Sequence, residues 1–361
     1  MSETRRLLIL ADDFSGACDA AGPFGVSRPT RVVAEAPAEW PSGVEVLAID
    51  LGVRECADGQ ARQRLDPLVR HLSALASRAR VFVKIDSTLR GPIGTLVAEG
   101  LDVSRKDVAV IAPAFPEQGR LLHAGHLVLH GRRGANLVDI VGAQGTALLA
   151  ATAARSTTEL ERAIEQARAQ GARRVLVDAD HAAGLARLGD VWRRHPEWLL
   201  VGSAGLARHL SPRGQIVRIE LDQSQGPLLV VAGSPAAATR EQLGRLESVA
   251  AEHVVVILRT PPALERDAGQ AAALLAAAVE RWASSRRPRA LFVTGGTTAR
   301  VVCERLGARA LCMLGELAPG VPLAVLEGGV WDGLPVVTKA GGFGTPETLL
   351  DVARALGVSS A

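Results

Sequence analysis

Four polar side chains that follow one another closely near residue 85 have the chemistry to bind a small anion. The segment VFVKIDSTLRGPIG, residues 81–94, is an apolar run that contains Lys84 and continues into Asp86, Ser87 and Arg90. Side chains alternate along a strand, so Lys84 and Asp86 point to one face. Arginine matches the planar geometry of a carboxylate or phosphate. The segment predicts a site for an acidic ligand, whose carboxylate we expect Arg90 to bind; an ion-paired turn is the alternative.

Two adjacent aspartates, Asp12 and Asp13, offer a second kind of chemistry in the segment LADDFSGACDA, residues 10–20. Phosphoryl transfer needs a positioned acceptor hydroxyl, a base or orienting carboxylate, and cations over the phosphates. Neighbouring side chains on an extended chain diverge, so we expect one aspartate to face the ligand and the other to hold the following turn. They are the candidate catalytic residues, and a pair that only caps a helix is the alternative.

Three turns in the C-terminal half place glycines next to hydroxyl groups. They read GSP, GGTT and GGFGTP, and each follows a short apolar run. Backbone N–H groups at a helix start bind phosphate, so such turns together favour a nucleotide site, although each alone could simply cap a helix. The sequence has neither a GxxxxGK[ST] motif nor a GxGxxG motif after a strand, which excludes a P-loop enzyme and argues against a dinucleotide fold.

The elements that must position these residues alternate between short apolar strands and helical periods, which is typical of an α/β protein. The sequence predicts strands at residues 7–11, 44–49, 81–85, 108–112, 174–178, 198–201, 228–232, 254–258, 291–294 and 335–339. It predicts helices at residues 60–79, 160–170 and 268–284, and a hairpin at 121–134. The polar clusters follow strands directly, at the edge where open α/β sheets bind ligands.

The length of 361 residues favours two domains, each with a mostly parallel sheet flanked by helices. The stretch from Ser211 to Pro227 is rich in turn formers and polar residues, so we predict domains at residues 1–215 and 216–361. In the second domain, Ser234 has the character of a helix N-cap and Pro235 that of the first helical residue.

Composition limits the classes of partner. The formal net charge is +3, aromatic residues make up 3% and no tyrosine is present, which argues against nucleic-acid binding. No run of 18 apolar residues occurs, so we expect no membrane span, and four cysteines without metal-type spacing favour a cytoplasmic protein with reduced thiols. His123, His126 and His130 do not fall on one strand face, so no metal site is predicted.

Several motifs together resemble one known family. ADDFSGACD, KIDSTLRGPIG, PAFPEQGR, VGSAGLARHL, AGSP, TGGTT, PGVP and TKAGGFG occur in this order, and they span nearly the whole chain. In these motifs the chain resembles the four-carbon acid sugar kinase family, whose members are ATP-dependent kinases of threonate, erythronate and 3-oxo-tetronate. The resemblance implies an acid-sugar domain followed by a nucleotide domain, with the active site between them and with ATP and Mg²⁺ as cofactors.

The resemblance also assigns residues. On the substrate side it implies Asp12, Arg54, Lys84, Asp86, Ser87 and Arg90. On the ATP side it implies Ser234, Gly295, Gly296, Thr297, Thr298, Gly341 and Gly344.

The chain departs from the family pattern at Pro92, Thr297 and Gly342, and the segment after Arg120 is shorter than in relatives. In relatives this segment helps to enclose the substrate, and closure excludes water from phosphoryl transfer. The shortened segment predicts a more open site, which accepts a bulkier acid or hydrolyses ATP when no acid is present.

These observations predict an ATP-dependent kinase that phosphorylates a terminal hydroxyl of a small sugar acid. One alternative is a non-catalytic sugar-acid or nucleotide-binding protein derived from such a kinase. Another is a phosphatase with Asp12 or Asp13 as nucleophile, but phosphatases of the haloacid dehalogenase type use Asp-x-Asp, and here the aspartates are adjacent. The sequence leaves the oligomeric state open, a homo-oligomer included.

Overall fold

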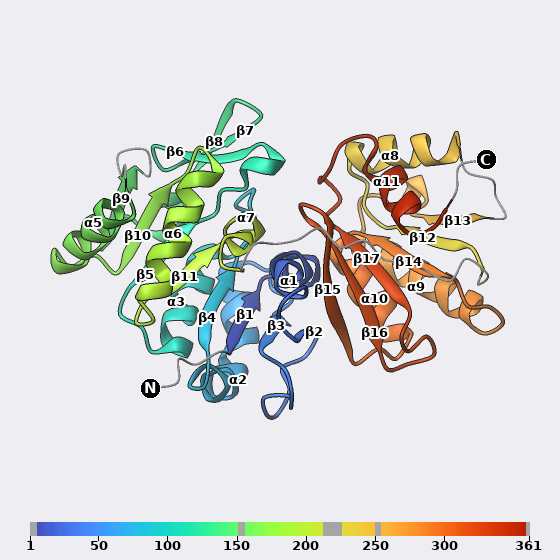
Figure 1. The fold of residues 1–361 in the computed structure, drawn as a ribbon, viewed down its shortest axis with the longest axis horizontal. Helices are drawn as coiled ribbons and strands as arrows, with labels where there is room; N and C mark the ends of the chain where they lie inside the picture. Colours follow the sequence, from blue (N-terminus) through green and yellow to red (C-terminus); the bar gives the residue numbers. More distant parts are fainter. Residues whose placement is uncertain (1–5, 151–155, 212–225, 250–253, 359–361) are drawn as a thin grey trace. The chain divides into compact units, whose positions relative to one another are not determined.

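The computed structural model describes residues 6–150, 156–211, 226–249 and 254–358, and the chain divides into two compact units (Figure 1). Unit 1 contains residues 1–20 and 35–213, and unit 2 contains residues 21–34 and 214–361. The predicted boundary at residue 215 lies outside the described residues. No helix of the described ranges has the length and hydropathy to cross a bilayer.

Unit 1 is built on a parallel sheet. Its strands run in the order β3 (Val46–Asp50), β1 (Leu7–Ala11), β4 (Arg80–Lys84), β11 (Leu199–Gly202), β5 (Ala109–Ala112), β10 (Arg174–Asp178) and β9 (Thr146–Ala150). Every residue of β1 is buried, as expected for a parallel strand that is covered on both faces. All strands from β3 to β9 in this order are paired in parallel.

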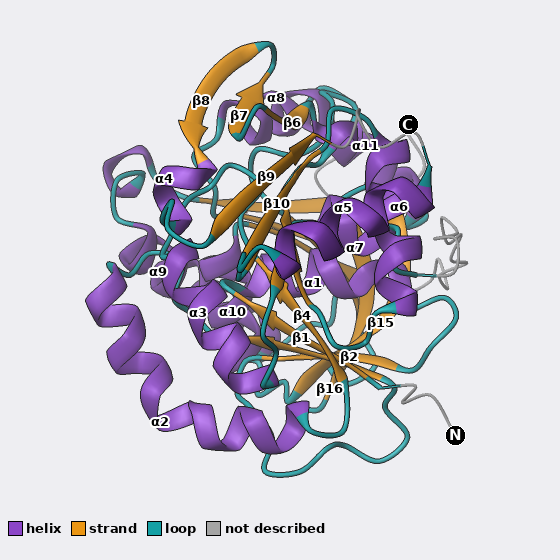
Figure 2. Cartoon of the chain, turned by 90° about the vertical axis from the view of Figure 1, so that its left-hand side faces the viewer, coloured by secondary structure: helices purple, strands orange, loops and turns teal. Residues whose placement is uncertain are grey.

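Helices cover both faces of this sheet. Figure 2 shows α2 (Asp58–Ala76) and α3 (Ile93–Ser104) on one side of the strands, and α5 (Thr157–Ala169) and α6 (Ala182–Arg194) on the other. Leu65 and Leu72 of α2 repeat at helical spacing and face Leu10 of β1 and Val83 of β4 around one apolar space. The helix predicted at 60–79 is therefore confirmed, and it begins at Asp58.

The segment predicted as a hairpin forms a small antiparallel sheet of three strands. These strands are β6 (Arg120–His123), β7 (His126–Leu129) and β8 (Arg132–Asn136). Each connection has two residues with positive φ, at Ala124-Gly125 (47° and 73°) and at His130-Gly131 (48° and 78°). Two such residues make the type of turn that matches strand twist, so the chain reverses twice rather than once.

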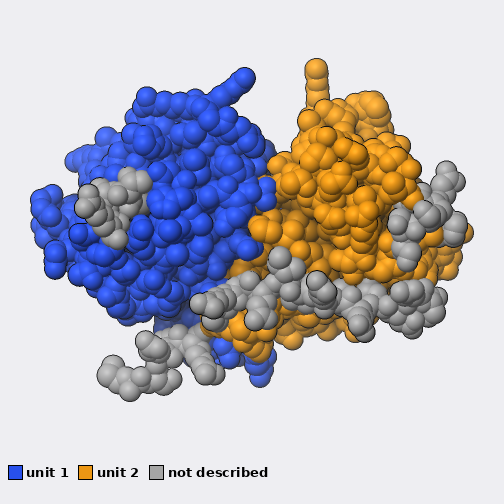
Figure 3. Space-filling model, turned by 45° about the horizontal axis from the view of Figure 1, so that its top comes forward, with its two compact units in different colours: residues 1–20, 35–213 blue, residues 21–34, 214–361 orange. Residues whose placement is uncertain are grey.

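Unit 2 has a mixed sheet. Its parallel part contains β13 (Val255–Arg259), β12 (Leu228–Ala232), β14 (Ala290–Thr294) and β17 (Pro335–Lys339), in that order. An antiparallel part follows with β16 (Val321–Glu327), β15 (Ala310–Ala318) and β2 (Thr30–Val33). Pairing of β2 with β15, where Val32 lies opposite Leu311, explains why residues 21–34 belong to unit 2 rather than to the predicted first domain (Figure 3, orange).

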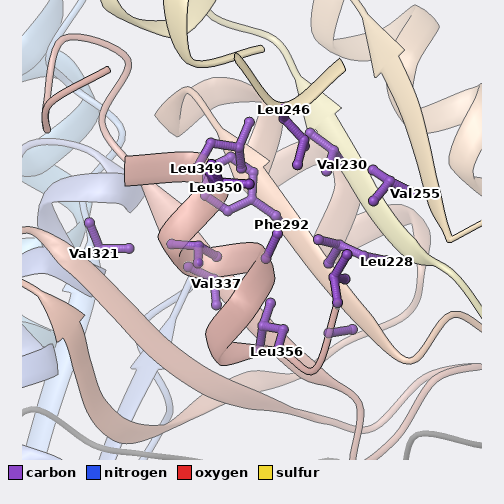
Figure 4. Packing of buried hydrophobic residues seen from close by; sticks show 14 of the residues in the cluster. Leu228, Val230, Leu246, Val255, Phe292, Val321, Val337, Leu349, Leu350 and Leu356 are labelled. Atoms are coloured by element: carbon purple, nitrogen blue, oxygen red, sulfur yellow. The ribbon is translucent and has the colours of Figure 1, made fainter. Parts of the chain in front are cut away.

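The core of unit 2 packs two helices on one face of the parallel strands. Phe292 lies at its centre, with Leu228 and Val337 from the neighbouring strands and Leu349 from a helix around it (Figure 4). The two helices are α8 (Ala237–Glu247) and α11 (Thr348–Ala355), whereas α9 (Ala268–Ala283) packs against α10 (Gly296–Arg305). Alternating strand residues face this core, and their neighbours, also buried, face the other side.

The predicted α/β fold with helices flanking the strands is confirmed, but the sheet of unit 2 is mixed rather than mostly parallel. Each predicted strand lies within two residues of an observed one. Strands β2, β9, β15 and β16 were not predicted from the sequence. The short helices of the described chain are α1 (Phe14–Ala21), α4 (Leu137–Val141), α7 (Ala204–Arg208) and the 3-10 turns Gly22–Phe24, Pro116–Gln118 and Pro262–Leu264.

Candidate active site

Parallel pairing brings the first aspartates and Lys84 to the same edge of the unit 1 sheet. Ala11, the last residue of β1, lies opposite Lys84 on β4. The N–H of Asp12 donates to the carbonyl of Lys84 at 3.2 Å, and the carbonyl of Asp12 accepts from the N–H of Arg54 at 3.0 Å. The backbone alone therefore places three predicted site residues side by side at the carboxyl ends of the strands.

Arg54 binds both aspartates. Its Nε and Nη2 donate to the two carboxylate oxygens of Asp12 at 2.8 and 2.6 Å, and its Nη1 donates to Asp13 at 2.5 Å. Burial alone would lower the pKa of Arg54, but the two carboxylates raise it above its usual value. Asp12 is fully buried, so this two-pronged ion pair holds both of its oxygens away from solvent.

Asp13 holds the start of α1. Its Oδ1 accepts from the N–H of Gly16 at 2.6 Å, and its Oδ2 accepts from the hydroxyl of Ser15 at 2.9 Å. The side chain is nevertheless 18% exposed, whereas that of Asp12 is not exposed. Asp13 therefore both holds the turn and has the more accessible side chain of the two aspartates.

Lys84 is a buried ammonium that makes no hydrogen bond with the part of the chain that the structure describes. Its side chain is 5% exposed, and the nearest carboxylate oxygen, on Asp12, lies 3.7 Å from Nζ. No hydrogen bond from this Nζ occurs within the described residues. A Cβ at Gly16 would lie 2.6 Å from the same Nζ, so glycine there lets the ammonium lie against α1. Because the ammonium has three donors, a ligand oxygen would complete its environment.

The loop after β4 folds around the carboxylate of Asp86. Nε and Nη2 of Arg90 donate to it at 2.7 and 3.3 Å, and the hydroxyl of Thr88 also donates to it. Burial would raise the pKa of Asp86, but the charge of Arg54 and the Arg90 hydrogen bonds lower it far below its usual range. Asp86 therefore accepts hydrogen bonds as an anion and is a poor base.

We predicted that Arg90 binds a ligand carboxylate, and this stays a prediction. In the structure its guanidinium is paired with Asp86 and its side chain is 61% exposed. The loop geometry explains this: Leu89 has φ +61° and Gly91 has φ +86°, so the chain curls back on itself. A Cβ at Gly91 would lie 2.9 Å from the carbonyl oxygen of Arg54, so glycine there allows close packing.

One buried arginine near these residues, Arg120, was not predicted from the sequence. Nη1 of Arg120, the first residue of β6, donates to Oγ of Ser87 at 2.5 Å, and both residues are buried. The loop before it closes through paired backbone hydrogen bonds between Phe115 and Arg120, at 2.7 and 3.1 Å. The motif PAFPEQGR contained this residue, but no local spacing related it to Ser87.

The GSAGLA motif holds the same loop in place. A Cβ at Gly205 would lie 2.5 Å from the carbonyl oxygen of Ala114, and Ser203 donates to that oxygen at 2.8 Å. Ser203 also caps α7 by accepting from the N–H of Gly205 at 3.1 Å. This motif therefore supports the loop that carries Arg120 rather than contributing a charge of its own.

In unit 2, the three glycine turns meet at the carboxyl edge of adjacent parallel strands. Thr294 at the end of β14 lies opposite both Ala232 of β12 and Lys339 of β17. A Cβ at Gly341 would lie 1.8 Å from Oγ of Ser234, and one at Gly233 would lie 1.9 Å from Oγ1 of Thr298. The three turns, here called the glycine turns (residues 233–235, 295–298 and 340–346), form one closely packed group.

The predicted role of Ser234 as an N-cap is wrong. Helix α8 begins at Ala237, and Ala236 is its N-cap. The hydroxyl of Ser234 instead accepts from the N–H of Ala236 at 3.3 Å, two residues on. This local turn delays the helix, because the hydroxyl satisfies an N–H before the helix starts.

The predicted glycines have local structural reasons. Gly295 has φ +101° and is the N-cap of α10, and Gly344 has φ +85° and packs against Thr348. Thr298 is buried beneath the turn at Gly233, whereas Thr297 is exposed. Thr297 is therefore more accessible to a ligand than Thr298.

Side chains beneath the glycine turns hold backbone carbonyls. Nζ of the buried Lys339 donates to the carbonyls of Ala340, Gly341 and Phe343 at 3.0, 3.3 and 3.1 Å. Nε2 of Gln242 donates to the carbonyls of Phe343 and Thr345 at 3.0 and 2.9 Å. Carbonyl oxygens repel an anion, so these bonds remove an obstacle to a phosphate near the turns.

Comparison with known proteins also distinguishes an N-terminal and a C-terminal part of the chain. A family model described as a sugar-binding N-terminal domain matches residues 7–210, and one described as a nucleotide-binding C-terminal domain matches residues 258–349. The chain belongs to the four-carbon acid sugar kinase family. The predicted family membership is confirmed.

Kinases of this family resemble the chain over almost their full length. A D-threonate kinase of Bordetella bronchiseptica is 31% identical, with 96% of each chain covered. A D-threonate kinase of Salmonella typhimurium is 28% identical over 96% of this chain and 97% of that protein. A 3-oxo-tetronate kinase of Pseudomonas savastanoi pv. phaseolicola is 27% identical over 95% and 96%. These relatives support a four-carbon acid sugar kinase function for the chain.

Solved structures show the same fold. A Salmonella typhimurium protein matches with a TM-score of 0.78 and 22% identity, covering 97% of this chain and 99% of its own. A Haemophilus influenzae protein matches with a TM-score of 0.69 and 21% identity, covering 96% and 99%. These two matches show that the fold of this chain occurs in other proteins at low sequence identity.

Proposed function

We propose that the chain is an ATP-dependent kinase that transfers a phosphoryl group to a terminal hydroxyl of a four-carbon sugar acid such as threonate, erythronate or 3-oxo-tetronate. The main observation behind the proposal is the buried ammonium of Lys84, which makes no hydrogen bond with the described residues although the neighbouring charged side chains are paired. The similarity of the chain to D-threonate and 3-oxo-tetronate kinases supports the choice of acid. We also propose a cytoplasmic location, which the four free cysteines support.

The hydrogen-bonding state of unit 1 favours a ligand rich in acceptors. The carboxylates of Asp12, Asp13 and Asp86 all accept hydrogen bonds from neighbouring side chains or backbone. By contrast, the N–H groups of the Lys84 ammonium donate to no oxygen among the described residues of this site. A carboxylate supplies acceptors and negative charge together, so we assign the carboxylate of the sugar acid to Lys84.

Of the two candidate catalytic residues, Asp12 and Asp13, we assign the catalytic role to Asp13. Asp12 has both oxygens bound by Arg54 in a buried ion pair, so its role is to fix Arg54. Asp13 is accessible, and its position is fixed by Gly16 and Ser15. In phosphoryl transfer such a carboxylate orients the acceptor hydroxyl and accepts its proton. The same ion pair argues against Asp12 as a phosphatase nucleophile.

The nucleotide is assigned to the glycine turns and the start of α10. Helix α10 has ten residues, and its first N–H groups follow Gly295. Such N–H groups favour phosphate oxygens. We propose that Gly296, Thr297, Gly344 and the nearby backbone contact ATP.

Mg²⁺ commonly keeps several waters and binds through phosphates with one or two carboxylates. The glycine turns contain hydroxyls and no carboxylate, so in unit 2 the phosphates of ATP would hold the ion rather than protein side chains. The bound ion would neutralise charge on the transferred phosphoryl group. The protein residues contribute the backbone donors described above.

The experiment measures ADP release from Mg-ATP with and without threonates, erythronates and 3-oxo-tetronates. The proposal expects ADP release that depends on one of these acids and an equal amount of phosphorylated acid. Binding of an acid without any ADP release would instead identify the non-catalytic alternative. ADP release that does not need an acid would show the uncoupled hydrolysis expected from the shortened segment after Arg120.

A further inference from the structure

The contact between Arg120 and Ser87 links two loops that are distant in sequence. Arg120 begins β6, and Ser87 lies in the loop after β4, 33 residues earlier. Nη1 of Arg120 lies 2.5 Å from Oγ of Ser87, and the two residues are 9% and 3% exposed. Because this buried guanidinium donates to the hydroxyl of Ser87, it determines the direction in which that hydroxyl can donate.

A guanidinium has N–H donors and no acceptor, so Ser87 must accept in this hydrogen bond. The hydroxyl hydrogen of Ser87 therefore points to some other acceptor. No described residue accepts a hydrogen bond from it. Donation by a charged group also polarises the O–H bond, which strengthens Ser87 as a donor.

The charges around Arg120 favour an additional anion. Asp86 and Asp19 attract the guanidinium, whereas Arg90 and Arg54 repel it. Burial, the largest effect, lowers the pKa of Arg120. An anionic oxygen bound by Ser87 would add a further attractive charge near this buried guanidinium.

We propose that Arg120 is a positioning residue that makes Ser87 a hydrogen-bond donor to an anionic oxygen of the ligand. This inference rests on the proposed function, in which unit 1 binds the sugar acid, and it assigns the oxygen to the carboxylate of that acid. A phosphoryl oxygen of ATP has the same chemistry, so the experiment must separate the two sources.

The experiment measures binding of D-threonate, D-erythronate and 3-oxo-tetronate to the full chain by calorimetry without nucleotide, and binding of ATP in parallel. Variants are Ser87→Ala, Arg120→Gln, Arg120→Lys and the double variant of Ser87→Ala with Arg120→Gln. Arg133→Gln is the matched control, because Arg133 is an exposed arginine of the same small sheet. Thermal melting verifies that each variant is folded.

The inference expects Ser87→Ala and Arg120→Gln each to weaken acid binding about 10- to 150-fold, as for a lost charge-assisted hydrogen bond. The double variant should bind the acid no more than about 3-fold more weakly than the weaker-binding single variant, because Arg120 acts through Ser87. Arg120→Lys should recover part of the affinity, since it keeps a charged donor. Arg133→Gln should bind as the wild type does.

Three results would overturn the inference. Losses that multiply in the double variant would show that Arg120 acts independently of Ser87. Unchanged acid affinity in Ser87→Ala would remove the donor role, and a loss confined to ATP would assign the oxygen to the nucleotide. If Arg120→Gln does not fold, Ser87→Ala and Arg120→Lys decide the question. Acid binding that responds as expected without any phosphoryl transfer would reject the kinase activity while supporting this inference.

Discussion

The two units present their candidate sites at the same structural position, the carboxyl edge of a parallel sheet, but they build them in opposite ways. Unit 1 uses charged side chains that fix one another, as Arg54 fixes Asp12 and Arg90 fixes Asp86. Unit 2 uses backbone turns, and its polar side chains hold the carbonyls of those turns. Side chains can match the shape of one acid, whereas backbone donors suit the phosphates of any nucleotide.

The two buried lysines show this difference most clearly. Nζ of Lys339 donates to three backbone carbonyls of the glycine turns. Nζ of Lys84 makes no hydrogen bond within the described residues, and its nearest carboxylate oxygen is 3.7 Å away. The same residue type is therefore structural in unit 2 and available for a ligand in unit 1.

The largest effect is expected at Asp13. Asp13→Asn keeps an oxygen for the N–H of Gly16 and therefore the start of α1, but it removes the charge that would accept the proton of the substrate hydroxyl. We expect kcat for phosphorylation of the acid to fall about 100- to 10,000-fold with little change in melting temperature. A variant with wild-type kcat would limit Asp13 to its capping role.

A second prediction separates the two lysines. Lys339→Met should lower the free energy of unfolding by about 2–5 kcal/mol, because several buried carbonyls lose their donor. Denaturant unfolding measures this change, and Lys106→Met, a lysine outside both sites, is the control. Wild-type stability in Lys339→Met would contradict the structural role that we assign to Lys339.

A smaller effect is expected at Arg90. Its side chain is 61% exposed and its pair with Asp86 is screened by solvent, so Arg90→Ala should weaken acid binding less than about 5-fold. Calorimetry of acid binding measures this. A loss of 10-fold or more would restore the direct contact between Arg90 and the carboxylate that the sequence suggested.

The sequence predicted the parts of the molecule that depend on local patterns. Asp12-Asp13 and the glycine turns directly follow apolar strands and Lys84 ends one, and the structure places them at sheet edges as expected. The pairings that define the site were not predictable in this way. Arg54 pairs with Asp12 across 42 residues and Arg120 with Ser87 across 33, so tertiary packing rather than spacing selects each partner.

The strands that the sequence analysis missed have a similar cause. Val321–Glu327 pairs antiparallel with Ala310–Ala318, and most residues of both are buried or partly buried on both faces. Gly315 and Glu316 interrupt the apolar run of residues 310–318 and Pro322 lies within residues 321–327, and these residue types argue against a strand. The strand Thr30–Val33 is short and pairs with residues far along the chain, so it too lacked a local signal.

The smallest effect concerns His195, which lies outside both candidate sites. Burial would lower its pKa, but hydrogen bonds to Glu161 and Glu197 raise it above the usual value. The contribution of protonated His195 to the free energy of unfolding is therefore complete below about pH 6.5, and it is lost as pH rises through the pKa of His195 in the folded state. His195→Gln should reduce stability by less than about 1 kcal/mol at pH 5.5 and less still at pH 9. A larger loss at pH 9 would contradict this sign.

The central claim is that unit 1 binds the acid through side chains and unit 2 binds ATP through backbone. Calorimetry on the full chain tests it directly, with the acid and ATP titrated separately into Lys84→Met and Gly296→Val. Lys106→Met and Gly244→Val are matched controls, because Lys106 lies outside both sites and a Cβ at Gly244 meets nothing within 4 Å.

We expect Lys84→Met to weaken acid binding about 10- to 150-fold and to leave ATP binding unchanged. Gly296→Val should abolish ATP binding and leave acid binding unchanged, because a branched side chain would block the backbone from phosphate. Loss of both ligands in one folded variant, or of the opposite ligand, would contradict the claim.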